Sequence, residues 1–79
     1  MTYPVLELPR NVEAEEVLLG SVLIDSAIFV EVAGAIKADD FYTVKHGWVW
    51  DVFAALDRRH DPIDLLTVGQ ELAKRKQLT

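Results

Sequence analysis

The stretch TVKHGWVWDVFAALDRR, residues 43–59, is the longest helical pattern in this 79-residue sequence. Its apolar residues recur at helical spacing through Val49, Phe53 and Leu56, which predicts a helix over 44–59 with one buried stripe. Thr43 is suited to cap the start of this helix, and the arginine pair at its end complements the helix dipole. The stretch therefore predicts an amphipathic helix that packs against other helices.

Two further helices are predicted before this stretch. Asn11 is suited to cap a helix over 12–24, whose first turns carry three glutamates where the dipole favours acidic side chains. Apolar residues at helical spacing predict a second helix over 26–37. Gly20 and Gly34 lie inside these two helices and indicate close approach between helices.

A fourth helix is predicted over 64–76, after an Asp-Pro turn, with Asp64 as its N-cap. Residues 1–10 contain two prolines, so an extended arm is expected there. No alternation typical of a strand occurs over a useful length. The sequence therefore predicts the all-α class, with an arm followed by a compact orthogonal bundle of four short helices over 11–79.

The expected core is small. A chain of this length buries only about 60% of the surface that its unfolded state exposes, so its stability is expected to be marginal. The sequence contains no cysteine, so a disulfide cannot add to that stability. The predicted core residues are Ala14, Leu18, Val22, Ile28, Val32, Phe41, Val49, Phe53, Leu56, Val68 and Leu72.

No arrangement of residues in the sequence indicates catalysis. The four glycines form neither a phosphate-binding loop nor a dinucleotide fingerprint, and two isolated histidines cannot build a zinc site. His46 is interpreted as a hydrogen-bonded residue at the edge of the core, and His60 as a contact at a helix end. The adjacent acids Asp39 and Asp40 form a poor chelate alone. We therefore predict no catalytic, cofactor-binding or metal-binding residue in this chain.

The charge balance disfavours contact with phosphates. The chain carries 13 acidic and 8 basic side chains, for a net charge of −5, so no direct nucleic-acid binding and no membrane contact are expected. The last two predicted helices are spaced like a helix–turn–helix, but the first turn of the second is apolar where a recognition helix needs polar side chains. The absence of cysteine and of a signal sequence favours a cytoplasmic location.

Trp48 is the residue that core packing explains least. Helical geometry places it at the margin of the buried face, which fits either a half-buried aromatic at the rim of the core or an interface anchor. We predict that Trp48 is exposed at the surface and contacts a partner.

Three motifs occur in order along the chain. Residues 11–16 read NVEAEE, residues 39–43 read DDFYT with His46 shortly after, and residues 62–67 read PIDLLT. In order and spacing, from residue 9 to residue 78, they resemble the N-terminal domain of DnaB-type replicative DNA helicases.

This resemblance implies a non-catalytic head domain that helps to assemble the helicase ring and receives partners. Members of the family carry the head ahead of a helical hairpin, which makes the dimer contact, and a RecA-like motor, which uses ATP and Mg²⁺ to unwind DNA. The expected partners are the other helicase subunits of a hexameric ring and a primase or helicase loader. The chain matches the head alone, so the hairpin and the motor are expected to be missing from it, and it holds no active site of its own.

Three positions depart from the pattern of the family that the chain resembles. Lys76 stands where glycine is usual, so the expected glycine C-cap is missing, Glu16 stands where glutamine is common, and Trp48 stands where polar residues are common. These departures favour a diverged helicase of phage or mobile-element origin. The alternatives are a free-standing adaptor of such origin that binds replication proteins, or a small helix–turn–helix DNA-binding regulator. Whether 79 residues form a fragment or a complete protein stays open.

Overall fold

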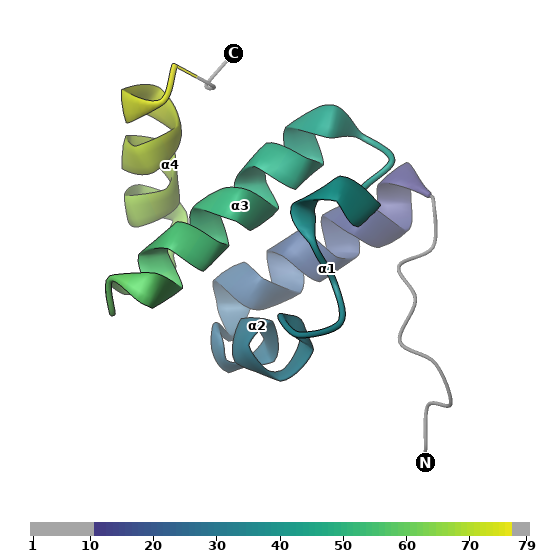
Figure 1. The fold of residues 1–79 in the computed structure, drawn as a ribbon, viewed down its shortest axis with the longest axis horizontal. Coiled ribbons are helices and arrows are strands. Elements are labelled where there is room, and N and C mark those ends of the chain that lie inside the picture. Colours follow the sequence, from purple (N-terminus) through teal and green to yellow (C-terminus); the bar gives the residue numbers. More distant parts are fainter. Residues whose placement is uncertain (1–10, 77–79) are drawn as a thin grey trace.

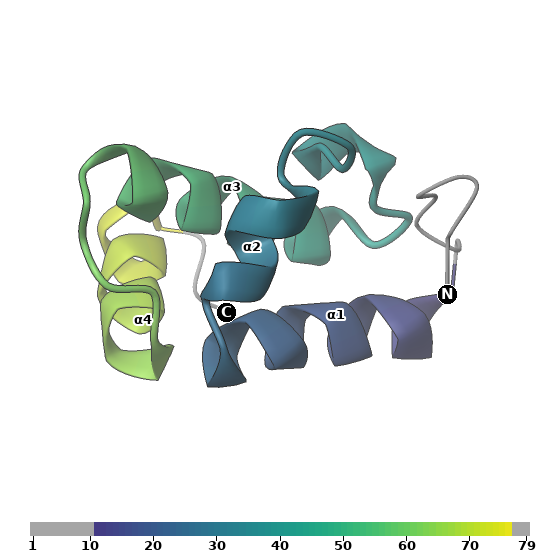
Figure 2. The same ribbon diagram turned by 90° about the horizontal axis from the view of Figure 1, so that it is seen from below.

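The computed structural model of the protein describes residues 11–76, which fold into four α-helices and one 3-10 turn. The extended arm expected over 1–10 lies outside the described residues. Figure 1 shows α1 and α3 running in the same general direction, and Figure 2 shows that they form two layers, with α4 crossing one end of α3 steeply. The all-α class is therefore confirmed. The elements are α1 (Val12–Ile24), α2 (Ala27–Val32), η1 (Ala38–Asp40), α3 (Val44–Arg58) and α4 (Leu65–Lys74).

The ends of α1 and α4 follow from local capping. The Asn11 side chain accepts a hydrogen bond from the backbone N–H of Ala14 at 3.0 Å, as the sequence predicts for an N-cap. The Asp64 side chain accepts from the N–H of Thr67 at 2.9 Å, and the Thr67 hydroxyl accepts from the N–H of Asp64 at 3.0 Å. These reciprocal bonds form a capping box that fixes the start of α4 one residue after the predicted position.

The second helix is much shorter than the predicted 26–37, because it ends at Val32. A turn follows, and Ile36 is then buried with its carbonyl oxygen accepting a hydrogen bond from the indole N–H of Trp50 at 3.0 Å. The residues predicted as the last turns of the helix therefore form a turn and an irregular segment, and the Ile36 carbonyl ties that segment to α3.

The core lies where α1, α2 and η1 pack against α3. Trp50 is its centre, because the rings of Phe29, Phe41 and Phe53 surround it at centroid distances of 4.9, 5.4 and 5.8 Å. Trp50 is not among the predicted core residues, although only 2% of it is exposed. The buried face of α3 is wider than one stripe because packed elements cover it on more than one side.

The predicted core residues fall into two groups in the structure. Val22, Phe41, Phe53, Leu56, Val68 and Leu72 are buried. Leu18, Ile28, Val32 and Val49 are half-buried against them, and Ala14 is half-buried outside that cluster. Sequence reasoning left out the buried residues Leu19, Phe29, Ile36, Trp50, Val52, Ala55 and Ile63.

The buried stripe of α1 is rotated by one residue from the prediction. Ala14, Leu18 and Val22 were expected to line it, but the buried residues are Glu15, Leu19 and Val22. Glu15 occupies the inner position because its carboxylate finds hydrogen-bond donors inside the fold. A buried acid with such partners is stable where an unpaired one is not.

Two residues after helix ends adopt the left-handed conformation. His60 has φ of 60° and Lys76 has φ of 59°, and the backbone N–H of each bonds to a carbonyl in the preceding turn. This is the C-cap geometry in which glycine costs least. Lysine forms this backbone at position 76, where the resemblance implies a glycine.

The close approach expected at Gly20 and Gly34 is found at Gly47 instead. A Cβ built at Gly20 or Gly34 meets no atom within 4 Å, whereas one at Gly47 would lie 2.7 Å from the carbonyl oxygen of Ala38. Gly47 is therefore the glycine that lets η1 rest against α3.

A Gly47→Ala substitution is expected to destabilise the domain by about 1–3 kcal/mol, because the added methyl group must push the backbone of η1 away from α3. Gly20→Ala is the matched control and is expected to be neutral or to stabilise by up to about 1 kcal/mol, since it improves helix propensity in open space. Urea unfolding at neutral pH measures both. Equal stability changes in the two variants would contradict the assignment of the close contact.

Candidate protein-interaction surface

Two neighbouring hollows lie between α3 and the segment that contains η1. The first has a volume of about 480 Å³ and the second a volume of about 610 Å³. They share Ala38, Asp39 and Asp51 and are therefore direct neighbours, and we call the two hollows together the α3 groove. The first hollow is lined by Ala38, Asp39, Phe41, Val44, Gly47, Trp48 and Asp51. The second is lined by Phe29, Ala33, Ile36, Lys37, Ala38, Asp39, Trp50, Asp51, Ala54, Asp57 and Arg58.

Trp48, the interface candidate of the sequence analysis, lines the first hollow. Trp48 is half-buried and packs against the core, so it is less exposed than the sequence predicts. Val44, one helical turn earlier, is an exposed apolar residue that lines the same hollow. Trp48 therefore stands at an accessible rim, while its contact with a partner stays a prediction.

The acids of the DDFYT motif have different surroundings. A carboxylate oxygen of Asp40 accepts a hydrogen bond from the backbone N–H of Lys37 at 2.7 Å, which closes η1. Within residues 11–76, no hydrogen bond or ion pair engages the carboxylate of the exposed Asp39. Asp39 therefore presents its charge to the α3 groove, while Asp40 is used to form the turn.

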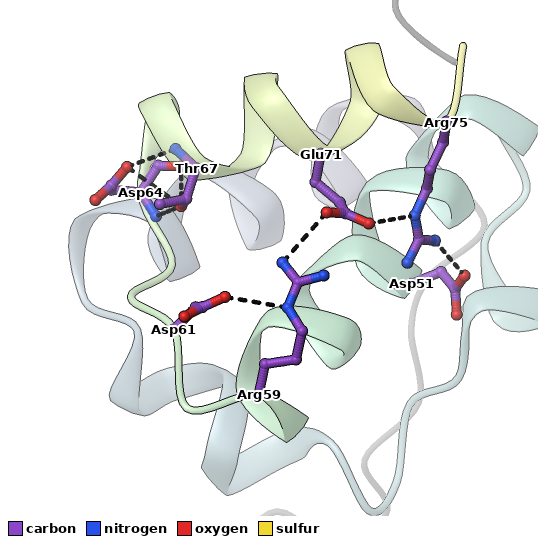
Figure 3. Close-up of polar contacts among 7 residues, drawn as sticks. All are labelled: Asp51, Arg59, Asp61, Asp64, Thr67, Glu71 and Arg75. Atoms are coloured by element: carbon purple, nitrogen blue, oxygen red, sulfur yellow. Dashed lines mark hydrogen bonds and ion pairs between the residues drawn. The ribbon is translucent and has the colours of Figure 1, made fainter.

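A chain of ion pairs joins α3 to α4 next to this groove. Figure 3 shows Glu71 between two arginines, with Oε1 3.2 Å from Nη2 of Arg59 and Oε2 2.9 Å from Nε of Arg75. Arg59 also pairs with Asp61 at 3.0 Å, and Arg75 pairs with Asp51 at 2.9 Å. The hydrogen bond from Arg75 lowers the pKa of Glu71 against the opposing effect of burial.

Sequence reasoning missed this network. The arginine pair at the end of the predicted helix 44–59, which includes Arg59, was assigned to the helix dipole alone. The pair Glu71 and Arg75 has the i, i+4 spacing at which side chains meet on a helix, and this signal indicates the first ion pair. Arg59 lies 12 positions from Glu71 and Asp51 lies 24 positions from Arg75, so no local pattern could show these two contacts.

A buried carboxylate connects the first two family motifs. Glu15 is fully buried, and its Oε2 accepts a hydrogen bond from the backbone N–H of Tyr42 at 2.6 Å. Its Oε1 accepts from the N–H of Thr43 at 3.2 Å and lies 2.8 Å from Nδ1 of His46. Burial alone raises the pKa of Glu15, but the hydrogen bonds from His46, Tyr42 and Thr43 together bring it below its usual value.

This contact explains His46. The sequence analysis interpreted it as a hydrogen-bonded residue at the core edge, and its partner is an acid 31 positions earlier in the chain. Because both oxygens of Glu15 are engaged within the fold, the pair clamps α1 to the start of α3. His60, the other histidine, is exposed beyond the end of α3.

The arrangement of α4 does not resemble a DNA-reading helix. Its first turn presents Leu65 and Leu66, whose exposed fractions are 76% and 68%. The basic side chains lie at the opposite end of the helix, and Arg75 is engaged with two acids there. A recognition helix needs polar or basic residues near its N-terminus.

Within residues 11–76, no three His, Cys, Asp or Glu side chains gather where they could hold a metal ion. None of the helices in that range combines the length and the apolar character that crossing a membrane requires.

The fold and its surface define a small helical domain whose accessible features are suited to protein contacts. Residues 7–79 match the family described as DnaB-like helicase N terminal domain, and the chain belongs to this family. The resemblance carried by its three motifs is thus confirmed.

Several replicative helicases are similar to this chain. It is 36% identical over 70 residues to the replicative DNA helicase DnaB of Geobacillus stearothermophilus, which covers 89% of the chain and 15% of that protein. It is 36% identical over 67 residues to the DnaB of Haemophilus influenzae, covering 85% and 14% of the two chains. It is 34% identical over 65 residues to the replicative DNA helicase DnaC of Bacillus subtilis, covering 82% and 14%. The chain thus spans about one seventh of the length of these relatives.

Proposed function

We propose that this chain is a non-catalytic protein-interaction and ring-assembly domain of a replicative DNA helicase. The observation that carries the proposal is the family match over residues 7–79. The similar proteins are replicative DNA helicases from three bacterial species, which supports a role in DNA replication. On this proposal, the domain contributes to replication through the surfaces that it offers to other proteins.

The proposed partners are the other subunits of the helicase ring and a primase or helicase loader. The α3 groove and the exposed leucines at the start of α4 offer apolar surface for such contacts. The acidic net charge suits a part that touches proteins while other parts of the ring hold the DNA.

ATP and Mg²⁺ are proposed to act in the motor domain of the parent protein and not in this chain. His46 and the buried acids Glu15 and Glu71 each have a structural partner within the described residues that accounts for them. We expect the 79-residue chain alone to hydrolyse no ATP above background.

A head-exchange experiment tests the proposal. The matching N-terminal segment of the Geobacillus stearothermophilus helicase is replaced by residues 7–79 of this chain. Light scattering after size-exclusion chromatography then measures the number of subunits, and a forked-duplex assay measures unwinding. The matched control is the same helicase with the head deleted. We expect the chimera to assemble and unwind better than the headless protein, because the head supplies assembly contacts. A folded chimera that performs no better would contradict the proposal.

A further inference from the structure

We propose that the α3 groove binds a basic amphipathic segment of a partner protein, with one lysine or arginine side chain entering the hollow beside Trp48. The inference rests on the proposed interaction function. It adds the face of the domain that is used and the chemistry of the segment that docks there.

Accessible apolar side chains line both hollows. The exposed Val44 and the half-buried Trp48 line the first, and the half-buried Ala33 and Ala54 line the second. Apolar side chains bordered by charges are complementary to a segment with one apolar face, as in other helix-in-groove complexes.

The groove is formed by contacts that exist without a partner. The Ala38 carbonyl approaches Gly47 so closely that a Cβ there would lie at 2.7 Å, and Trp50 is held to Ile36 by its indole hydrogen bond. Because these contacts fix η1 against α3, docking needs little rearrangement of the backbone. A preformed site lowers the entropic cost of binding.

The charges divide the groove into two parts. Among residues 11–76, the hollow beside Trp48 is lined by Asp39 and Asp51 and by no basic residue. The second hollow is lined by the same two acids and Asp57, and also by Lys37 and Arg58, which offset two of these three negative charges. A cation is therefore favoured in the first hollow.

The side chains of the first hollow suit an extended cationic group. The Trp48 ring offers an aromatic surface that attracts a guanidinium or ammonium group. Asp39 lines the same hollow, and no hydrogen bond or ion pair with another described residue engages its carboxylate, whereas one oxygen of Asp51 already accepts a hydrogen bond from Arg75. Trp48 and Asp39 are thus the two residues on which recognition of the cation depends.

A peptide titration tests the inference. The probe is a fluorescein-labelled helical peptide of about 15 residues made of leucine, alanine and arginine, with the leucines on one face. Its counterpart carries glutamate in place of every arginine. Anisotropy measures both affinities, and ¹⁵N-resolved NMR of the full 79-residue chain locates the contact. We expect the basic peptide to bind more tightly than the acidic one, with the largest shifts at the α3 groove.

Substitutions assign the contact to individual side chains. Asp39→Asn and Trp48→Ala are each expected to weaken binding of the basic peptide by about 5-fold. Trp48→Phe keeps an aromatic ring and is expected to restore part of the affinity. Glu13→Gln removes an exposed charge that does not line the groove and is expected to change affinity by less than about 2-fold. Because Asp39 is exposed, its variant tests the inference even where a tryptophan variant folds poorly.

Three outcomes would overturn the inference: equal binding of both peptides, shifts centred away from the groove, or an Asp39→Asn effect no larger than that of Glu13→Gln. These outcomes leave the head-exchange result untouched. A chimera that assembles while the peptide results fail would refute the groove inference alone. A chimera that fails while Asp39 and Trp48 control peptide binding would refute the helicase function alone.

Discussion

Phe53→Ala is expected to lower the free energy of unfolding by about 3–5 kcal/mol, which would unfold most of a domain of this size. The Phe53 side chain is fully buried, and its ring lies 6.0 Å from that of Phe29 and 5.8 Å from that of Trp50. Removing the ring leaves a cavity at the junction of α2 and α3 that neighbouring side chains fill only in part. Circular dichroism during thermal and urea unfolding measures the loss.

Two further variants control this result. Val17→Ala truncates an exposed residue of α1 and is expected to change stability by less than about 0.5 kcal/mol. Phe53→Leu keeps most of the apolar volume and is expected to cost less than about 1.5 kcal/mol, which keeps the protein folded and measurable. An unchanged melting curve for Phe53→Ala would contradict the assignment of Phe53 to the core.

Glu15→Gln is expected to destabilise the domain by about 2–3 kcal/mol at neutral pH. Glu15 accepts hydrogen bonds on both oxygens, and a glutamine offers only one acceptor oxygen. Its amide group would then face a donor, either the backbone N–H of Thr43 or that of Tyr42. Urea unfolding at pH 7 tests this, with Glu16→Gln as the exposed neighbouring control.

The same carboxylate gives the stability a defined pH dependence. Its pKa is lowered in the folded state, so the unfolded state binds the proton more readily. The stabilisation from Glu15 is therefore fully present above the unfolded pKa of about 4.3 and is lost as the pH falls through the lower folded pKa. We expect the difference in the free energy of unfolding between wild type and Glu15→Gln to shrink as the pH falls through this range. If this difference in the free energy of unfolding stays constant from pH 7 to pH 3, ionisation of Glu15 does not contribute to the stability of the fold.

The helix positions could largely be predicted because their signals are local. Asn11 and Asp64 cap helices through bonds to residues three positions away, so the chain alone places those starts. The path of the chain after α2 could not be predicted in this way, because its contact with α3 is a hydrogen bond between the Ile36 carbonyl and Trp50, which lies 14 positions later.

The register of α1 was missed for a related reason. Glu15 looks like a surface acid in a helical pattern, and its donors lie 27 to 31 residues later in the chain. The candidate site was found only in part. Helical geometry placed Trp48 at the margin of the buried face, but the groove beside it exists because Gly47 lets η1 settle on α3.

The subunit number of the head-exchange chimera tests the central claim most directly. If residues 7–79 form the head of a replicative helicase, the chimera assembles into particles with the same number of subunits as the unmodified Geobacillus stearothermophilus helicase, and the headless control assembles less completely. A chimera whose head is folded by circular dichroism, but whose mass equals that of a single subunit, would contradict the claim.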